Sequence, residues 1–249
     1  MLNISAIIQA RIGSTRLPGK VLMKLNEDTV LSLLLKQLKH SKFLAEKIIA
    51  TTNNPKDDVI EKFTTSNNIK LFRGDSDNVL DRYYQCAKRF SLTHIVRITA
   101  DNPLIDPDII DQAIKKYSTF NYDYLTNSID RTFPNGTEVE IFSFDALEIA
   151  WKYAKKKSER EHVTPYFYNN PKKFKIHHFK QKKNQSKFRY TIDRKEDYAL
   201  IVEILSRIKK RPVRTSDIID LLTTNPQLLK LNSHIITNEG YIKSIKEDW

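Results

Sequence analysis

The sequence is poor in the features that mark membrane proteins and disulfide-rich secreted proteins. Its 249 residues include a single cysteine, Cys86, which excludes an internal disulfide and a cysteine metal site. No apolar run approaches the roughly 20 residues that span a bilayer. The first residues lack the basic leader and the cleavage site of a signal peptide. These absences predict a cytoplasmic protein with no membrane insertion.

Internal repeats and low-complexity linkers are also lacking. The composition is that of an ordinary globular chain, with 40% hydrophobic and 29% charged residues. A chain of this length can bury a sizeable core without dividing into units. We therefore expect residues 1–249 to form a single domain.

Positive charge is abundant and unevenly distributed. The formal net charge is +12, and residues 152–214 hold 20 Lys or Arg against 6 Asp or Glu. Such a segment suits a nucleic acid, an anionic membrane surface or an anionic small substrate. No helix-turn-helix, RNA-recognition or zinc-finger pattern accompanies it, and aromatic residues are not interleaved with the basic ones. We interpret the lysine clusters as a solvated surface and expect no nucleic-acid partner.

Strand-like and helix-like patterns alternate in the first half of the chain. We expect strands at Ile4–Ala10, Lys47–Thr52, Ile69–Phe72 and His94–Thr99, and helices at Thr29–Lys39, Asp57–Thr65, Val79–Phe90 and Pro107–Tyr117. This order predicts an α/β fold, a three-layer α/β/α sandwich around a mainly parallel mixed sheet. Ligands of such sheets bind beyond the carboxyl ends of the strands. The loops to inspect are Gln9–Lys20, Thr52–Lys56, Arg73–Asp77 and Ala100–Asp106.

The second half is less regular. Strands are expected at Tyr122–Thr126, Val139–Phe144, Phe174–Phe179 and Arg189–Ile192, and helices at Phe144–Lys155, Glu159–Asn169, Asp197–Ile208 and Ser216–Leu222. From Asn225 onward the patterning is too weak to predict structure. We interpret the basic middle portion as an elaboration on the sheet.

The loop after the first strand carries the strongest functional signal. Residues 9–20 read Gln-Ala-Arg-Ile-Gly-Ser-Thr-Arg-Leu-Pro-Gly-Lys, with three cations, two hydroxyls, two glycines and no acidic residue. Glycines allow close backbone approach, and guanidinium forks with backbone N–H groups suit a triphosphate. The spacing is neither that of a Walker loop nor that of the Gly-x-Gly-x-x-Gly fingerprint. We predict a phosphate-binding loop, against the alternative of a solvated basic turn.

This loop resembles the first motif of the sugar cytidylyltransferases, which include the CMP-ulosonate and CMP-sialate synthetases. Later segments resemble the SpsF-type spore-coat-polysaccharide branch in the same order; they are residues 72–75, 79–84, 97–106, 135–140, 158–165, 191–193 and 196–197. The resemblance covers nearly the whole chain. It implies a nucleotide-diphospho-sugar transferase-like fold and an enzyme that transfers CMP from CTP to an acceptor oxygen with Mg²⁺, releasing pyrophosphate.

The resemblance also implies roles for individual residues. Arg11, Lys20 and Asp101 would be catalytic, and Asp101 and Asp193 would hold Mg²⁺, although each aspartate could instead cap a turn or a helix. The nucleotide-binding set would be Gln9, Ala10, Arg11, Gly13, Ser14, Arg16, Lys20, Arg73, Gly74 and Asp101. Within it, Arg73 and Gly74 would read the cytosine. Arg82 is a further candidate for this role, although we favour its interpretation as a helix-surface ion pair with Asp81 or Asp77.

On the acceptor side the resemblance implies Glu138, Glu140, Arg160, Glu161 and His162. The acceptor would be an anionic sugar, either ulosonate-like or a sugar phosphate, used in surface polysaccharide or glycoconjugate synthesis. The family pattern is broken by Arg194-Lys195, which could favour a more anionic substrate. An irregular extension around residues 120–190 would form a homodimer interface.

Three alternatives remain open at this stage. A UTP-dependent sugar-phosphate nucleotidylyltransferase would share the fold but usually opens with a glycine-richer loop. A glycosyltransferase of similar fold would use an Asp-x-Asp metal motif, for which Asp106-Pro107-Asp108 has the spacing. A non-catalytic protein that binds nucleic acid through its basic lobe is the third.

Overall fold

A seven-stranded mixed sheet forms the centre of the molecule in the computed structural model, which describes residues 2–248. The strands, in spatial order, are β5 (Lys70–Gly74), β4 (Leu44–Thr52), β1 (Ile4–Gln9), β6 (His94–Thr99), β8 (Glu140–Ser143), β7 (Tyr124–Thr126) and β9 (Ile176–His178). Strands β5, β4, β1 and β6 run parallel, and only β8 runs antiparallel to its neighbours β6 and β7. The predicted mainly parallel mixed sheet is confirmed.

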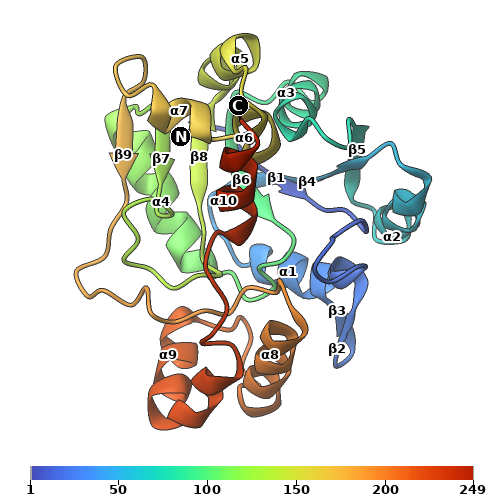
Figure 1. Cartoon of the computed structure of the whole chain (residues 1–249), viewed down its shortest axis with the longest axis vertical. Helices are drawn as coiled ribbons and strands as arrows, with labels where there is room; N and C mark the ends of the chain where they lie inside the picture. Colours follow the sequence, from blue (N-terminus) through green and yellow to red (C-terminus); the bar gives the residue numbers. More distant parts are fainter. Residues whose placement is uncertain (1, 249) are drawn as a thin grey trace.

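Two helical layers cover the sheet because successive strand residues point to opposite faces. Ile8 and Ile49 face the cluster that includes α1 (Val30–Leu38), α2 (Asp58–Ser66) and α4 (Pro107–Phe120). Ile7 and Ile48 face the cluster that includes α3 (Val79–Arg89), α5 (Phe144–Tyr153) and α7 (Pro165–Asn169). Figure 1 shows the sheet between these groups of helices, as a three-layer α/β/α sandwich requires.

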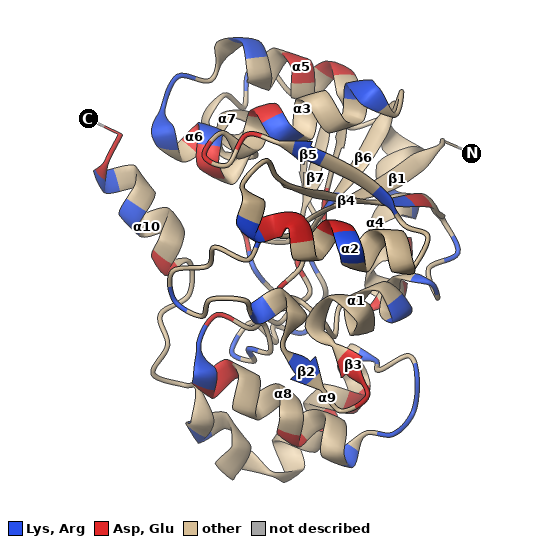
Figure 2. Ribbon diagram, turned by 90° about the vertical axis from the view of Figure 1, so that its right-hand side faces the viewer, with Lys and Arg blue, Asp and Glu red and all other residues tan. Residues whose placement is uncertain are grey.

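A third hydrophobic cluster lies beside the sheet rather than on it. Helices α8 (Lys195–Arg207) and α9 (Thr215–Thr224) and the 3₁₀ helix η3 (Pro226–Leu231) contribute most of its side chains. They pack against Leu17 of the first loop, Val30 and Leu33 of α1, and Leu25 of the hairpin formed by β2 (Lys24–Leu25) and β3 (Asp28–Thr29). These helices form the lower part of the molecule in Figures 1 and 2.

The C-terminal helix α10 (Glu239–Lys246) stands apart from all three clusters. It packs against α6 (Lys157–His162), and Ser244 is its one buried residue within the described part of the chain. Figure 2 shows α10 at the side of the molecule, away from α8 and α9. The remaining short 3₁₀ helices are η1 (Lys20–Leu22) and η2 (Pro55–Asp57).

Two sequence predictions of secondary structure are wrong, and each has a local cause. The helix expected at 159–169 is divided into α6 and α7, because Val163 adopts a positive φ of 71° and Pro165 follows. The strand expected at Arg189–Ile192 is absent. Its N–H groups bond to scattered partners, Tyr190 to the Asn135 carbonyl and Ile192 to the Asp101 carbonyl, each at 2.8 Å, so no regular ladder forms.

Among residues 2–248, no helix is long and apolar enough to cross a membrane.

Candidate active site

A large polar cleft of about 1350 Å³ lies beyond the carboxyl ends of β1 and β6. Three of the four loops singled out in the sequence contribute to it, namely those following β1, β5 and β6, whereas the loop after β4 does not. Residues 128–140, α6, the segment 189–193 and α10 complete the walls. The site therefore lies where the topology of a parallel sheet predicts a ligand.

The first loop presents its basic residues to this cleft. Gln9, Ala10, Arg11, Ser14, Arg16 and Lys20 line it, whereas Gly13 does not. Asp57 holds the loop in place by accepting the Ile12 N–H at 2.7 Å, and Gly19 donates its N–H to the Ile12 carbonyl at 2.9 Å. Gly19 has a φ of 72°, a conformation that glycine adopts without strain, and it turns the chain into η1. Arg11 is exposed and makes no hydrogen bond or ion pair with any described residue, so it is available to a ligand.

Lys20 joins the two aspartates that the sequence singled out. Its ammonium lies 2.8 Å from Asp101 Oδ2, 3.0 Å from Asp193 Oδ1 and 2.7 Å from the Ile192 carbonyl oxygen. Burial alone would lower the pKa of Lys20, but the two carboxylates raise it, so the amine stays charged. Burial alone would raise the pKa of Asp193, but Lys20 and Arg16 hold it well below its usual range. Lys20 and Asp193 are thus both charged at neutral pH.

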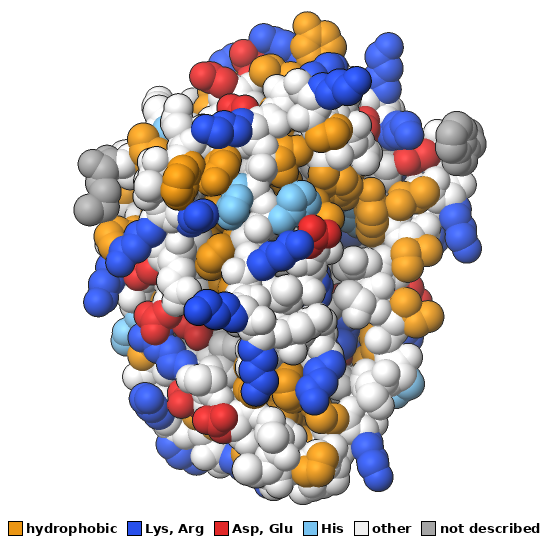
Figure 3. All heavy atoms as spheres, turned by 90° about the vertical axis from the view of Figure 1, so that its left-hand side faces the viewer, with side chains coloured by type: hydrophobic (Ala, Val, Ile, Leu, Met, Phe, Trp, Pro, Cys, Tyr) orange, Lys and Arg blue, Asp and Glu red, His pale blue; other side chains and the backbone are white. Residues whose placement is uncertain are grey.

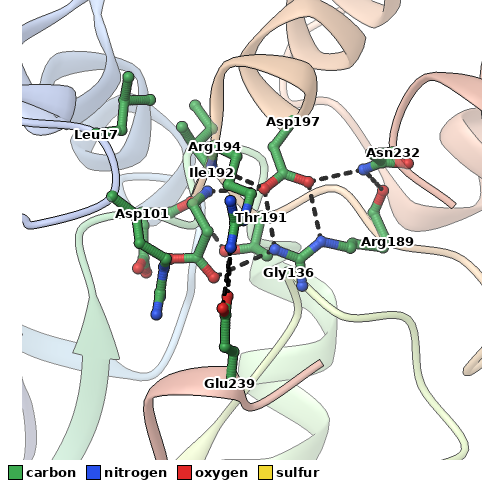
Figure 4. Close-up of polar contacts among 12 residues, drawn as sticks. Leu17, Asp101, Gly136, Arg189, Thr191, Ile192, Arg194, Asp197, Asn232 and Glu239 are labelled. Carbon is green, nitrogen blue, oxygen red and sulfur yellow. Dashed lines mark hydrogen bonds and ion pairs between the residues drawn. The ribbon is translucent and has the colours of Figure 1, made fainter. Parts of the chain in front are cut away.

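A second, buried carboxylate fixes the position of Asp193. Asp197 has no exposed surface, and it accepts the Arg189 guanidinium through both oxygens at 2.9 Å each and Asn232 Nδ2 at 2.8 Å. It also accepts the backbone N–H of Asp193 at 2.9 Å and that of Arg194. Figure 4 shows Asp197 in contact with both Arg189 and Asn232. Asp193 is therefore presented to the cleft by a rigid support.

The two residues expected to read the base do not line the cleft. Arg73 turns toward α2, where it bonds Asp58 and Glu61 at 2.7 and 2.6 Å and donates to the carbonyls of Thr52 and Asn54. A Cβ on Gly74 would lie 2.9 Å from the Phe72 ring and 3.1 Å from Arg82 Cγ. Close packing against these side chains is therefore the reason for glycine at position 74.

Arg82 occupies the place that was expected of Arg73. Its predicted ion pair at the helix surface is wrong, because the residue is only 1% exposed and lines the cleft. It donates to the Asp75 carbonyl at 3.1 Å, and its Nε has no partner among the described residues. Gln9 Oε1 is likewise buried and unpartnered. A buried donor and a buried acceptor left unpaired at the cleft wall indicate a polar ligand there.

The two glutamates of the acceptor side are held by protein groups. Glu140 is paired with Arg97 and accepts the hydroxyls of Tyr124 at 2.5 Å and Thr164 at 2.8 Å. Glu138 is paired with Arg131 and accepts Asn102 Nδ2 at 3.1 Å and the Gly136 N–H at 2.9 Å. Their main effect is to orient two arginines, Arg97 and Arg131, that line the cleft.

The remaining acceptor-side residues connect α6 to α10. His162 Nε2 lies 3.0 Å from Ser244 Oγ, which lies 2.7 Å from Glu161 Oε2. The Tyr241 ring stands edge-on to both His162 and Tyr168, with ring centroids 5.2 and 6.5 Å apart. Arg160 donates its Nε to the Ala154 carbonyl. Glu161, His162 and Arg160 all line the cleft, and α10 adds a wall that the sequence did not reveal.

Helix α10 is also tied to the segment that bears Asp193. Arg194 donates to both carboxylate oxygens of Glu239 at 2.9 Å, a contact drawn in Figure 4. The Gly240 backbone approaches the first loop so closely that an added Cβ would lie 3.4 Å from Arg16 Nη1. Arg194 is therefore occupied by Glu239, and the sequence had left it as a possible contact for a more anionic substrate.

The carboxylate oxygens at the floor of the cleft suit a hard cation that is also bonded by oxygens of a substrate. Within the described chain, no group of three or more His, Cys, Asp or Glu side chains could enclose a metal. Mg²⁺ is commonly held by one or two carboxylates together with substrate phosphates and waters. Asp101 and Asp193, already bridged by a cation in the form of the Lys20 ammonium, meet this description.

Comparisons with known proteins identify the family of the chain. Residues 5–221 match the model of a protein family described as cytidylyltransferase. Over 236 residues the chain is 41% identical to the uncharacterized protein MJ1063 of Methanocaldococcus jannaschii, covering 94% of this chain and 96% of that one. It is 34% identical to the spore coat polysaccharide biosynthesis protein SpsF of Bacillus subtilis, covering 91% and 96%.

A solved structure has the same fold along almost its whole length. The cytidylyltransferase of Leptospira borgpetersenii serovar Hardjo-bovis superposes with a TM-score of 0.89 at 35% identity, over 95% of this chain and 100% of that one. Helix α10 lies beyond the residues that the family model matches.

Proposed function

The chain belongs to the cytidylyltransferase family and is a nucleotidyltransferase, and on that premise we propose that it transfers CMP from CTP to an anionic sugar and releases pyrophosphate. The observation that carries this proposal is the cluster of Lys20, Asp101 and Asp193 at the floor of a cleft whose rim bears the free Arg11. Cations and carboxylates side by side suit a triphosphate that arrives with a divalent ion.

The chemistry is a substitution at the α-phosphorus. An acceptor hydroxyl gives its proton to water as its oxygen bonds to that phosphorus, and the bond to the bridging oxygen of pyrophosphate breaks. Arg11, Arg16 and Lys20 would bind the phosphate oxygens and offset the negative charge that develops on them. Ser14, whose hydroxyl lies 3.4 Å from the Leu17 N–H, lines the same wall.

Mg²⁺ is the metal that we propose for Asp101 and Asp193. It would neutralise phosphate charge and lower the pKa of the attacking hydroxyl. Arg16, at 2.8 Å from Asp193 Oδ1, and Arg189, at 3.2 Å from Asp193 Oδ2, keep that carboxylate oriented. The protein's own contribution is a pair of carboxylates fixed by backbone and guanidinium contacts.

We assign the cytosine base of CTP and the acceptor to different ends of the cleft. The base is assigned to the end lined by Gln9, Asp75, Asn78 and Arg82, where Arg82 Nε and Gln9 Oε1 offer an unpaired donor and acceptor to a polar ring. Arg97 Nε and Asn102 Oδ1, elsewhere in the cleft lining, are unpaired as well within the described part of the chain. The acceptor goes to the end with Arg97, Arg131, His162 and Tyr241. Arginines suit a carboxylate or phosphate, and the aromatic rings offer an apolar face to a sugar. The name of the SpsF relative supports a role in polysaccharide precursor synthesis.

The Asp-x-Asp sequence that would serve a glycosyltransferase as its metal motif has a structural role instead. Asp106 caps α4, accepting the Asp108 N–H at 2.9 Å, and it also accepts the Thr215 N–H at 2.8 Å. It is 5% exposed and does not line the cleft. The Asp106-Pro107-Asp108 sequence therefore joins α4 to α9 and does not form a metal site.

Pyrophosphate release measured with each of the four nucleoside triphosphates and Mg²⁺ tests the proposal. The acceptor panel consists of ulosonates, other acidic sugars and sugar phosphates. We expect release with CTP and one acceptor class. Asp101→Asn should lower the rate by about a hundredfold or more, because a metal carboxylate becomes neutral.

The matched control is Asp108→Asn, which removes one carboxylate that is 54% exposed and lies away from the cleft. Preference for UTP would contradict the cytosine assignment and leave the metal assignment intact. Failure of every triphosphate to bind in calorimetry with Mg²⁺ would overturn the enzymatic proposal.

A further inference from the structure

Lys20 has no hydrogen-bonding capacity left for a substrate in the structure as it stands. An ammonium has three N–H donors, and those of Lys20 go to Asp101 Oδ2, Asp193 Oδ1 and the Ile192 carbonyl. Its side chain is only 10% exposed. It extends from η1 across the floor of the cleft to two other segments of the chain. A residue expected to hold a triphosphate is therefore fully engaged by protein oxygens.

The ammonium also lies where a metal ion would have to bind. One nitrogen is 2.8 Å from an oxygen of Asp101 and 3.0 Å from an oxygen of Asp193. Mg²⁺ bonds its oxygen ligands at about 2.0–2.1 Å. An ion that bonded the same two oxygens would compete with the Lys20 ammonium for both of them. A monovalent and a divalent cation held that close together in a partly buried site repel each other strongly.

We propose that Lys20 is a placeholder for the divalent cation, so that the metal is admitted only together with the triphosphate. This inference rests on the proposed function, which supplies the metal and the nucleotide. The Lys20 ammonium neutralises Asp101 and Asp193 until phosphate oxygens offer it other partners. Lys20 would then turn to the triphosphate, and Asp101 and Asp193 would be left to hold the metal. In the absence of nucleotide, the Lys20 ammonium already neutralises the charge of the two carboxylates that would bind the metal.

The surroundings allow this exchange without collapse of the site. Asp193 keeps Arg16 and Arg189 when Lys20 leaves, and its backbone N–H stays bonded to Asp197. The Asp101 segment stays joined to Ile192, whose N–H donates to the Asp101 carbonyl at 2.8 Å. Two of the three groups that Lys20 joins are thus connected to each other independently of it. Only the lysine side chain has to move.

A titration of the protein with Mn²⁺ alone tests this proposal directly. Electron paramagnetic resonance measures the ion that remains unbound. Lys20→Met removes the charge but keeps an unbranched side chain. We expect the wild type to bind Mn²⁺ at least about tenfold more tightly with a non-hydrolysable CTP analogue than without it. Lys20→Met should bind Mn²⁺ alone at least about tenfold more tightly than the wild type does. Combining Lys20→Met with Asp101→Asn should abolish that gain.

Controls separate this inference from its premise. Lys24→Met removes one positive charge from an exposed residue nearby and should leave Mn²⁺ affinity unchanged. Lys20→Gln repeats the test if the methionine variant has a lowered melting temperature. If neither Lys20 variant gains affinity while Asp101→Asn weakens Mn²⁺ binding with the analogue, the placeholder is wrong and the metal site stands. If Asp101→Asn and Asp193→Asn leave that binding unchanged, the metal assignment fails and the inference fails with it.

Discussion

His162 shows how its surroundings fix the protonation state of one side chain in the cleft. Burial lowers the pKa of His162 to about 4, with Arg97 and Arg11 acting in the same direction and Glu161 and Glu140 opposing them. The imidazole is therefore neutral at physiological pH. Since Ser244 lies at its Nε2 and Tyr241 stands edge-on to its ring, the neutral form is part of the contact between α6 and α10.

A pH dependence of stability follows from this neutral histidine. An unperturbed histidine has a pKa near 6.5, so between that value and about 4 the unfolded chain binds more protons than the folded one. Stability is then fully present above about pH 6.5 and is lost as the pH falls toward 4, by roughly 2 kcal/mol for this group. We expect urea unfolding curves of the wild type to show this loss and those of His162→Gln to show less of it.

The control variant is His40→Gln, which removes an exposed histidine in place of the buried one. Asp193 and Asp197 have lowered pKa values, so their contributions fade only below about pH 4 and are common to all three proteins. Equal slopes for the wild type and His162→Gln between about pH 4.5 and 6.5 would contradict the assignment.

Single residues also mark the limit of what the sequence could predict about the site. The family resemblance implied functional roles for Lys20, Asp101 and Asp193, and the structure brings these three residues together. Arg73 and Arg82 could not be told apart in this way. Arg73 points from β5 toward α2, whereas Arg82 lies on the buried side of α3. Which of them reaches the cleft depends on packing between elements and not on local pattern.

At the scale of elements, burial explains which helices were predictable. Helices α1 and α3 bury seven residues each, so their apolar stripes are visible in the sequence. Helix α10 buries only Ser244, so its sequence contains no apolar stripe that would predict a helix. It is held by polar contacts instead, among them Glu239 with Arg194 and Ser244 with His162 and Glu161. Polar contacts between distant segments have no periodic signature, so both the helix and its place in the cleft escaped prediction.

Because α10 is held by polar contacts, we expect the rest of the fold to form without it. A chain ending at Thr237 loses the wall that carries Tyr241 but none of the three hydrophobic clusters. We expect its melting temperature to fall by only about 2–4 °C and its CTP affinity to change by less than about threefold. Pyrophosphate release at low acceptor concentration should fall at least about tenfold, because the acceptor end of the cleft is left open.

Ile242→Ala and Ile245→Ala are the controls within α10, since these side chains are 44% and 40% exposed and do not line the cleft. Tyr241→Ala should reproduce the truncation in acceptor dependence. A large loss of CTP affinity in the truncated chain would instead place α10 at the nucleotide.

At the scale of the whole molecule, the net positive charge and the cleft are largely separate. The cleft is lined by ten Lys or Arg and nine Asp or Glu residues, so it is almost balanced. The formal net charge of +12 therefore lies mainly on other surfaces. Figure 3 shows Lys and Arg side chains scattered over one such face, with acidic and hydrophobic ones between them. The interpretation of the basic lobe as a solvated surface fits this distribution, while pairing of two copies through residues 120–190 stays a prediction.

Charge outside the cleft acts on a substrate only at long range, which gives a last prediction. Lys182 and Lys183 are exposed and lie away from the cleft, and replacing both by Glu lowers the net charge from +12 to +8. Such a field attracts an anionic nucleotide and is screened by salt. We expect kcat/KM for CTP to fall about two- to threefold at about 20 mM KCl and to match the wild type at about 500 mM.

Arg11→Met provides the contrast within the cleft. A residue that contacts phosphate keeps most of its effect in salt, because a bound and partly buried pair is screened little. Its loss in kcat/KM should therefore persist at about 500 mM KCl. A loss for the double lysine variant that also persisted at high salt would mean that these lysines touch the substrate, and the balanced cleft would not be the whole binding surface. Salt dependence thus separates residues that attract the nucleotide from residues that hold it.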